Sequence, residues 1–305
     1  MIKIAIAGTG GLAQYIAHFI SNQTNHHFIL LSRQQNPGLV AKGWQVIKVD
    51  YSNRDELRYS LTGVDTVIST ISGAAQISLI DAAAHVHVRR FVPSEFEGRP
   101  ALSPQQPDAL DRGKAASLTR LQYYQKYGME YTCFVCGIFY ERFAPGGMAS
   151  LQLGHGTNIS GEGDYVMDIR KRKAHVPFYS NAGQVVRTCM TSAEDVARFV
   201  VAALELPQWP TEFRMRGDRM SVSEIVQVAE AMTGGTEFEK VSYTEDSLQD
   251  SLTYARALGN VKEQWRLHHL IATAANRYDF QNPNLNGMVP VQPRRFRDWL
   301  YSAWA

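Results

Sequence analysis

Hydrophobic positions in the first half of the chain follow two alternating patterns. Short apolar runs rich in β-branched residues have the length and composition of buried parallel strands. The stretches between them repeat apolar residues at helical spacing. The expected strands are Ile2–Gly8, His27–Arg33, Trp44–Asp50, Asp65–Ile71, Val88–Phe96 and, with its exit loop, Met129–Phe143. The expected helices are Leu12–Ser21, Arg54–Val64, Gln76–His85 and Asp108–Gly128. This order predicts an α/β fold with a Rossmann-type doubly wound parallel sheet.

The alternation is lost after residue 147. Residues 148–190 are rich in glycine, polar and basic residues, and we expect loops with short strands there. Helices are expected over Ser192–Glu205 and Ser221–Gly235, each with its serine as N-cap, and in "SLQDSLTYARALG" and "KEQWRLHHLIATAA". We therefore expect residues 1–145 to form an NAD(P)-binding domain. Residues 146–305 should form a smaller, mainly helical substrate-binding region, with part of 185–220 returning to the sheet.

Composition narrows the functional classes. The chain has 305 residues, 45% hydrophobic and 20% charged, and a net charge of +2 gives no reason to expect nucleic-acid or membrane binding. The sequence opens in a strand pattern without a basic n-region, so we expect no secretory signal peptide. Three cysteines argue against a disulfide framework and suit a reducing cytosol. These features predict a cytoplasmic monomer or homodimer that acts on a small molecule.

The segment "GTGGLA" carries the first chemical signal. It spans Gly8, Thr9, Gly10, Gly11, Leu12 and Ala13 and fits the dinucleotide pattern G-x-G-x-x-G/A. Gly8 allows the tight turn, Gly10 leaves room for a pyrophosphate, and Ala13 lets helix and strand pack closely. The start of the following helix offers N–H donors to an anion. A glycine-rich turn without a ligand is the alternative.

The end of the second strand favours NADPH over NADH. NAD-binding chains usually have an acidic residue about 20 residues past the glycines, to hold the ribose 2′-hydroxyl. Here that place is occupied by Ser32 and Arg33, and a guanidinium can pair with a 2′-phosphate. An exposed surface arginine is the alternative. Further nucleotide contacts are expected at the ends of the third to fifth strands, from Asp50, Tyr51, Thr70, Ile71, Ser94 and Glu95.

The usual Tyr-x-x-x-Lys pair of Rossmann-type reductases is missing. Every lysine lacks a tyrosine four residues upstream. Lys114 lies near the start of an expected helix, where it could hold a proton close to a cofactor. A solvated surface lysine is equally consistent with the pattern alone.

Several blocks resemble a known family. "GTGGLAQYI", "RRFVPSEFEG", "DRGKAASLTRL", "GMEYTCFVCGIFYERF" and "TSAEDVARFVVAAL" look like successive blocks of the NmrA-like, isoflavone-reductase-like branch of the atypical short-chain dehydrogenases. The resemblance is closest to fungal members. It implies that Lys114 is the catalytic lysine, beside the nicotinamide and the substrate oxygen, and that NADPH reduces a phenolic substrate. The segment between "SEF" and Lys114 differs from the plant reductases, which predicts a different pocket rim.

Several other residues are candidates for the site, and most of them have a second, structural interpretation. Glu95 could orient Lys114 or cap a helix. Phe139, Tyr140 and Phe143, like Phe96, could contact a planar substrate or close a core, and Tyr140 is a second candidate proton donor. Tyr165 and Met167 are candidate pocket residues. Cys133 and Cys136 have C-x-x-C spacing, but we expect buried structural cysteines and no metal site.

These observations predict an NADPH-dependent reductase of a small aromatic or polyketide-type specialised metabolite. The alternative is an NmrA-like regulator that senses NADP(H) without turnover and acts through a protein partner. A redox-neutral enzyme on the same fold is a third possibility.

Overall fold

The computed structural model describes residues 1–102 and 109–305. Contacts divide them into two compact units. Unit 1 contains Met1–Phe96, Asp111–Val135 and Ala197–Phe213, and unit 2 contains Glu97–Leu110, Cys136–Val196 and Arg214–Ala305. The chain therefore passes between the units more than once; the expected division was residues 1–145 and 146–305, with part of 185–220 returning to the sheet.

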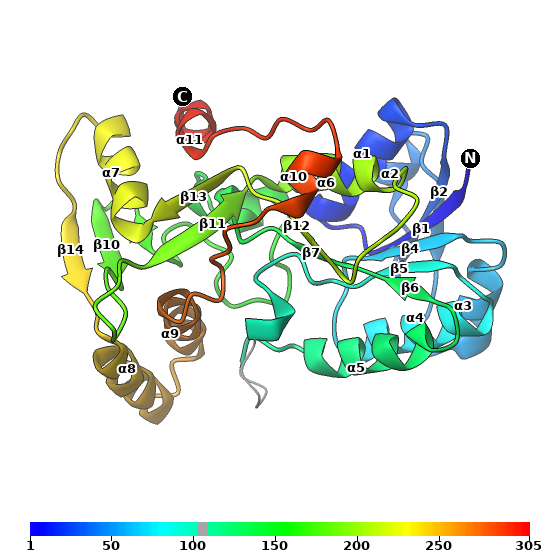
Figure 1. The fold of residues 1–305 in the computed structure, drawn as a ribbon, viewed down its shortest axis with the longest axis horizontal. Helices are drawn as coiled ribbons and strands as arrows, with labels where there is room; N and C mark the ends of the chain where they lie inside the picture. Colours follow the sequence, from blue (N-terminus) through cyan, green and yellow to red (C-terminus); the bar gives the residue numbers. More distant parts are fainter. Residues whose placement is uncertain (103–108) are drawn as a thin grey trace. The chain divides into compact units, whose positions relative to one another are not determined.

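Unit 1 is built on a six-stranded parallel sheet (Figure 1). Its strands are β1 (Lys3–Ala7), β2 (His27–Ser32), β3 (Val46–Lys48), β4 (Thr66–Ser69), β5 (Arg90–Val92) and β6 (Glu130–Tyr131). The strand order is β3-β2-β1-β4-β5-β6, so the order reverses between β1 and β4. The predicted Rossmann-type sheet is confirmed, and ligands of such sheets bind outside the carboxyl ends of the strands at this reversal.

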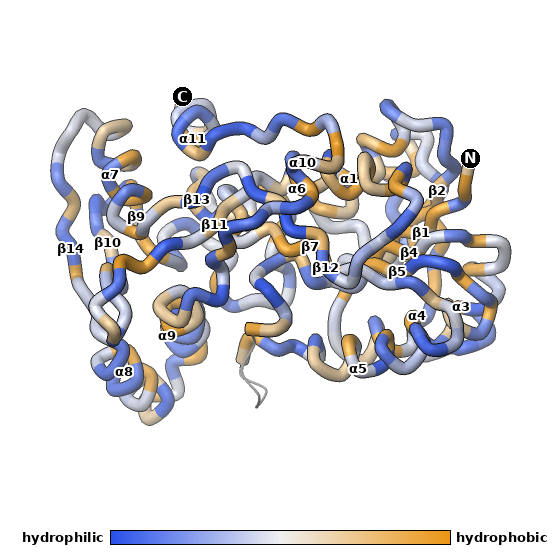
Figure 2. The backbone as a smooth tube through the Cα atoms, in the orientation of Figure 1, coloured by the Kyte–Doolittle hydropathy of each residue, from blue (hydrophilic) through white to orange (hydrophobic). Residues whose placement is uncertain are grey.

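Helices cover both faces of this sheet. They are α1 (Gly11–Gln23), α2 (Pro37–Val40), α3 (Arg54–Ser60), α4 (Ala74–His85), α5 (Lys114–Gln125) and the end of α6 (Ala193–Ala203). The helices α3, α4 and α5 lie along one face, where their apolar side chains share a core with the strands (Figure 1). The apolar strands stand out in the centre of this unit in Figure 2. Burying this surface gives the main stabilisation of the unit.

The helix that carries Lys114 is shorter than expected. We predicted a helix over Asp108–Gly128, but α5 begins at Lys114. Arg112 and Gly113 have φ values of 47° and 83°, which are left-handed and break the helical path. The carboxylate of Asp111 accepts the N–H groups of Gly113 (3.0 Å) and Ala115 (2.9 Å). A turn therefore places Lys114 at the start of the helix. Asp108 and the rest of residues 103–108 lie outside the described residues.

Unit 2 combines small sheets with helices. Its strands are β8 (Ile138–Phe139), β9 (Met167–Asp168), β10 (Lys173–Val176), β11 (Arg187–Thr191), β13 (Asp218–Ser221) and β14 (Glu239–Ser242). They form two three-stranded sheets, β14-β10-β9 and β13-β11-β8. The remaining strands, β7 (Cys133–Val135) and β12 (Glu212–Arg214), pair with each other; β7 belongs to unit 1, and β12 passes from unit 1 into unit 2 after Phe213. The helices are α7 (Val222–Met232), α8 (Glu245–Ala257), α9 (Val261–Ala274), α10 (Asn284–Met288) and α11 (Phe296–Trp304).

The two predicted serine caps are confirmed. Ser192 Oγ accepts the N–H of Asp195 at 3.0 Å, and Ser221 forms a capping box with Glu224. Each cap satisfies a backbone donor that would otherwise lack a partner at the start of its helix.

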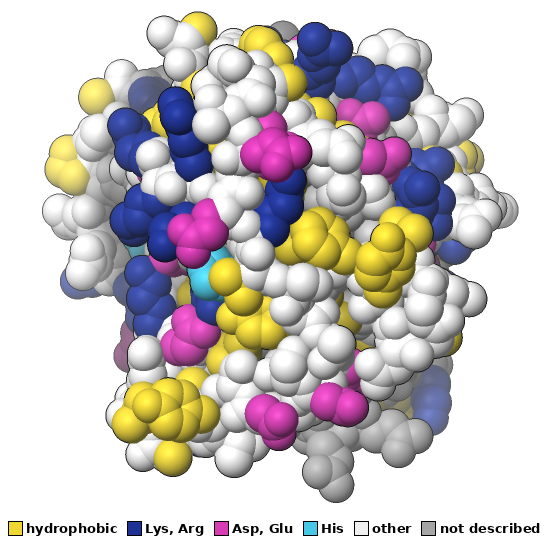
Figure 3. All heavy atoms as spheres, turned by 90° about the vertical axis from the view of Figure 1, so that its left-hand side faces the viewer, with side chains coloured by type: hydrophobic (Ala, Val, Ile, Leu, Met, Phe, Trp, Pro, Cys, Tyr) yellow, Lys and Arg dark blue, Asp and Glu magenta, His cyan; other side chains and the backbone are white. Residues whose placement is uncertain are grey.

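The surface mixes charges of both signs. On the face drawn in Figure 3, basic and acidic side chains lie interspersed. In the basic segment Asp168–His175, Arg170, Lys171 and Lys173 each pair with a carboxylate. None of the helices in the described ranges has both the length and the hydropathy needed to cross a bilayer.

Candidate functional site

The glycine-rich turn connects β1 to α1. Gly8 has a φ of 110° and donates its N–H to the carbonyl of Leu31 at 2.9 Å. A Cβ added to Gly8 would overlap Thr70 Oγ1, so only glycine fits. Helix α1 starts at Gly11 after Gly10, and among the described residues no side chain caps it. The start of α1 therefore presents backbone N–H groups and the positive end of the helix dipole, as an anion site requires.

Tyr51 and Thr70, two of the predicted nucleotide contacts, support this turn through hydrogen bonds. Tyr51 is 6% exposed and donates its hydroxyl to the Leu31 carbonyl at 3.0 Å. Thr70 donates its hydroxyl to the carbonyl of Ala7 at 2.9 Å. Burial raises the pKa of the Tyr51 phenol, so it stays protonated as a donor. Tyr51 is therefore a buried support of the turn, at a position where we expected a nucleotide contact.

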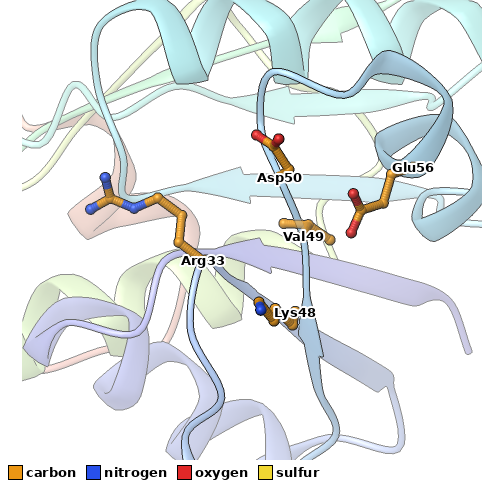
Figure 4. A pocket seen from close by; sticks show the side chains of 5 residues that line it. All are labelled: Arg33, Lys48, Val49, Asp50 and Glu56. Atoms are coloured by element: carbon orange, nitrogen blue, oxygen red, sulfur yellow. The ribbon is translucent and has the colours of Figure 1, made fainter.

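A hollow opens where β2 and β3 end. It has a volume of about 470 Å³ and is lined by Arg33, Lys48, Val49, Asp50 and Glu56. Figure 4 shows Arg33 on the chain next to the segment that carries Lys48 to Asp50, with its guanidinium directed away from that segment, and Glu56 on α3 on the other side. Hydrogen bonds from the Ser52 backbone N–H and hydroxyl lower the pKa of Asp50, so its carboxylate is ionised near neutral pH. The hollow therefore offers two cations and two acidic side chains to a polar ligand.

Ser32 differs from its neighbour Arg33. Ser32 is buried, and its hydroxyl oxygen accepts the N–H of Gln34 at 3.2 Å. Arg33 is exposed. Ser32 therefore shapes the chain after β2, and Arg33 is the side chain that faces the hollow.

Lys114 and Glu95 come together at the carboxyl edge of the same sheet. Lys114 Nζ lies 3.7 Å from Glu95 Oε2, and the two side chains are 14% and 6% exposed. Glu95 follows β5, and Lys114 is the first residue of α5. Of the two interpretations of Glu95, the geometry favours the one in which it orients Lys114.

The turn before Lys114 is anchored to the end of β4. Arg112 donates to Ser72 Oγ at 3.0 Å, and a Cβ on Gly113 would lie 3.0 Å from Gly73 Cα. Ile71, a predicted nucleotide contact, is half-buried in this β4–α4 connection. These contacts hold Lys114 beside the β4 exit loop, which carries the predicted nucleotide contacts Thr70 and Ile71.

The predicted substrate-binding side chains are mostly buried within their own units. In unit 1, Phe96 stacks on Phe134 at 6.2 Å between ring centroids. In unit 2, Phe143, Tyr165 and Met167 belong to one apolar core, and Phe139 is half-buried on β8. The core interpretation of these residues fits the structure better than contact with a ligand.

Tyr140 also belongs to the core of unit 2. Its side chain is fully buried against Phe296 and Trp299, and its hydroxyl donates to the carbonyl of Arg294 at 3.1 Å. Burial raises its pKa well above the usual range. A tyrosine with this partner and burial is suited to packing and not to proton donation.

Sequence reasoning missed three parts of the site. Lys48 and Glu56 line the hollow but belong to no motif, since only folding brings them to Arg33. Gln76 is fully buried on α4 beside the β5 exit loop. Its spacing from Leu79, Ile80 and Ala83 puts it on the apolar face of α4, which was a signal for a buried, hydrogen-bonded amide.

Among the described residues, no group of three His, Cys, Asp or Glu side chains could hold a metal ion. The cysteines Cys133, Cys136 and Cys189 are buried free thiols. Burial raises the pKa of Cys133 well above its ordinary value. The C-x-x-C spacing therefore belongs to buried thiols, as expected.

The sequence model of the NmrA-like family matches residues 2–274. The chain belongs to the NmrA-like family. This NmrA-like protein is 32% identical to the oxidoreductase BOA1 of Botryotinia fuckeliana over 249 residues, 77% of each chain. It is 24% identical to the isoflavone reductase homolog A622 of Nicotiana glauca over 266 residues, 80% of this chain and 78% of the other.

A solved structure shares the fold of this NmrA-like protein. The NADPH-dependent quinone oxidoreductase QOR2 of Escherichia coli, complexed with NADPH, matches 99% of this chain and 100% of its own with a TM-score of 0.73 at 14% identity. The predicted family and fold class are confirmed, and oxidoreductase is the class of both BOA1 and QOR2 by name.

Proposed function

We propose that this NmrA-like protein is an NADPH-dependent reductase of a small aromatic or polyketide-type metabolite. The Lys114–Glu95 pair carries the proposal, because it lies at the same edge of the sheet as the glycine turn and the Arg33 hollow. A protein that only sensed a dinucleotide would have no need of this buried lysine–carboxylate pair.

The residues present fit NADPH. Gly8 makes the tight turn against Thr70, where no Cβ fits, and the uncapped start of α1 supplies donors to a diphosphate. Arg33 and Lys48 are suited to the 2′-phosphate, and the ionised Asp50 is suited to accept from the adenine amino group. These contacts explain why the place of the usual acidic residue after β2 is occupied by Arg33.

Lys114 supplies the proton of the reduction. When bound, NADPH provides a hydride for an electrophilic carbon of the substrate. Reduction of a carbonyl also requires one proton at the oxygen, and the ammonium of Lys114 donates it. Glu95, at 3.7 Å from Nζ, holds the ammonium in place. The 14% exposure of Lys114 leaves a route for its proton to be replaced from water.

The names of related proteins support the substrate class. A622 of Nicotiana glauca is named as an isoflavone reductase homolog, and QOR2 acts on quinones by name. Planar conjugated carbonyl compounds are therefore the first substrates to test. The buried free thiols of all three cysteines suit a reducing compartment, and we place the protein in the cytoplasm.

The test is NADPH consumption by the purified protein with a panel of quinones, enones and phenolics, followed by the loss of NADPH absorbance. We expect turnover with at least one member and loss of that turnover in Lys114→Met. The regulator would be supported instead if NADPH bound tightly without turnover and if Lys114→Met changed no property of the complex with NADPH.

A further inference from the structure

One buried amide in unit 1 connects the two segments that carry Glu95 and Lys114. Gln76, on the first turns of α4, is fully buried. Its Oε1 accepts the N–H of Ser94 at 2.7 Å, and its Nε2 donates to Ser117 Oγ at 3.0 Å. A buried amide with both ends engaged is a fixed bridge between the segments that it joins.

The orientation of this amide follows from its partners. A backbone N–H can only donate, so the group that faces Ser94 must be the carbonyl oxygen of Gln76. The Ser117 hydroxyl donates to the carbonyl of Gly113 at 2.9 Å, so its oxygen is the acceptor for Gln76 Nε2. The bonds therefore run in one direction, from Gln76 through Ser117 to Gly113.

Each end of the bridge lies one residue from the Lys114–Glu95 pair. Ser94 directly precedes Glu95, and Gly113 directly precedes Lys114. The pair itself is 3.7 Å apart, a separation that a small shift of either backbone segment would change. Gln76 thus sits where it can set the relative position of the two side chains without touching either a substrate or a cofactor.

We propose that Gln76 is the positioning residue for Lys114, acting through Ser94 and Ser117 to hold the ammonium against the Glu95 carboxylate. The expected effect on turnover rests on the proposed function, whereas the expected effect on the position of Lys114 does not depend on it. Displacing a catalytic group by a fraction of its contact distance lowers the rate of the step that it assists.

A second hydrogen bond between the same helices provides a matched control. Tyr124 on α5 donates its hydroxyl to Asp81 Oδ1 on α4 at 3.0 Å. Tyr124 lies ten residues after Lys114, near the other end of α5. Tyr124→Phe therefore removes one α4–α5 hydrogen bond without touching the turn that carries Lys114.

The experiment compares Gln76→Met, Ser117→Ala and Tyr124→Phe in the full chain. The first readout is the rate at which acetic anhydride acylates Lys114, followed by peptide mass spectrometry over a range of pH. We expect Gln76→Met to raise this rate by roughly fivefold, because the ammonium moves away from Glu95. Ser117→Ala should give a smaller increase in the same direction, and Tyr124→Phe should leave the rate unchanged.

The second readout is turnover. Gln76→Met should lower kcat by about tenfold or more and leave the Kd for NADPH within about twofold of the unaltered protein. An unchanged acylation rate in folded Gln76→Met and Ser117→Ala overturns the inference, whatever the turnover. An equal change in Tyr124→Phe overturns it too, since the effect would then be general loosening. If the unaltered protein turns over nothing, the proposed function fails while the acylation comparison still decides the role of Gln76.

Discussion

Replacing Arg33 by alanine tests how the cofactor is chosen. The hollow is lined by two basic residues, Arg33 and Lys48, and by two acidic residues, Asp50 and Glu56. Without Arg33, one cation remains against two acidic side chains, so a 2′-phosphate would meet net negative charge. NADH lacks that phosphate, so its Kd should not change.

The magnitude follows from the exposure of Arg33. A hydrogen bond to a charged group contributes about 1.5–3 kcal/mol. Arg33 is exposed, and screening by solvent and salt favours the lower part of this range. A loss of about 1.5–2 kcal/mol corresponds to a roughly 10- to 30-fold weaker Kd for NADPH.

The assay is a fluorescence titration of each nucleotide at fixed ionic strength. Lys126→Ala is the matched control, because it removes one exposed cation at the far end of α5. We expect Arg33→Ala to weaken NADPH alone and Lys126→Ala to change neither nucleotide. An equal loss of NADPH and NADH in Arg33→Ala, or no loss at all, would refute the assignment of this hollow to the 2′-phosphate.

Three further predictions address the site and its scaffold. Lys114→Met should lower kcat by about a hundredfold or more and leave NADPH binding nearly unchanged, whereas the same substitution at Lys126 should do neither; equal kcat values would contradict the proton role. Gly8→Ala should lower the free energy of unfolding by at least about 1–2 kcal/mol, since it forces a left-handed φ and an overlap with Thr70, and should weaken NADPH binding; chemical denaturation and titration check both. Burial raises the pKa of Glu141 from 4.5 to about 8, so the folded protein keeps a proton there that the unfolded chain releases. The contribution of this group to the free energy of unfolding is therefore complete below about pH 4.5 and is lost as the pH rises towards 8, by at most about 5 kcal/mol. Glu141→Gln should flatten this decline in denaturation curves measured across that pH range. The same pH dependence in both proteins would contradict the role of Glu141.

The fold of unit 1 could be predicted because its signals are local. The apolar runs at β1, β2 and β4 are short, those at β1 and β4 are rich in β-branched residues, and "GTGGLA" lies between the first strand and the first helix. The start of α5 could not be predicted in the same way. Its position depends on the left-handed turn at Arg112 and Gly113, and Arg112 is an uncommon residue for that conformation.

The candidate site was predicted in part. Arg33, Asp50, Lys114 and Glu95 all come from strand ends or helix starts, where sequence position indicates function. The aromatic residues after β7 showed the limit of this reasoning. A tyrosine at the position of Tyr140 follows a strand whether it serves as a proton donor or as a core residue. Only the structure shows that its ring packs against α11 and that its hydroxyl already has a backbone partner.

The buried supports of the site depend on tertiary contacts. Tyr51 braces the Gly8 turn by sharing the Leu31 carbonyl, and Gln76 joins the β5 exit to α5. Both residues have ordinary sequence contexts, and their partners are far away along the chain. Such roles become visible only when the donors and acceptors are placed in space.

Calorimetric titration of the unaltered protein with NADPH and, separately, with NADH tests the central claim most directly. We predict saturable heat with one NADPH per chain and a Kd at least about tenfold lower than that for NADH. The absence of heat with either nucleotide, or tighter binding of NADH, would contradict the assignment of the glycine turn and the Arg33 hollow to this cofactor.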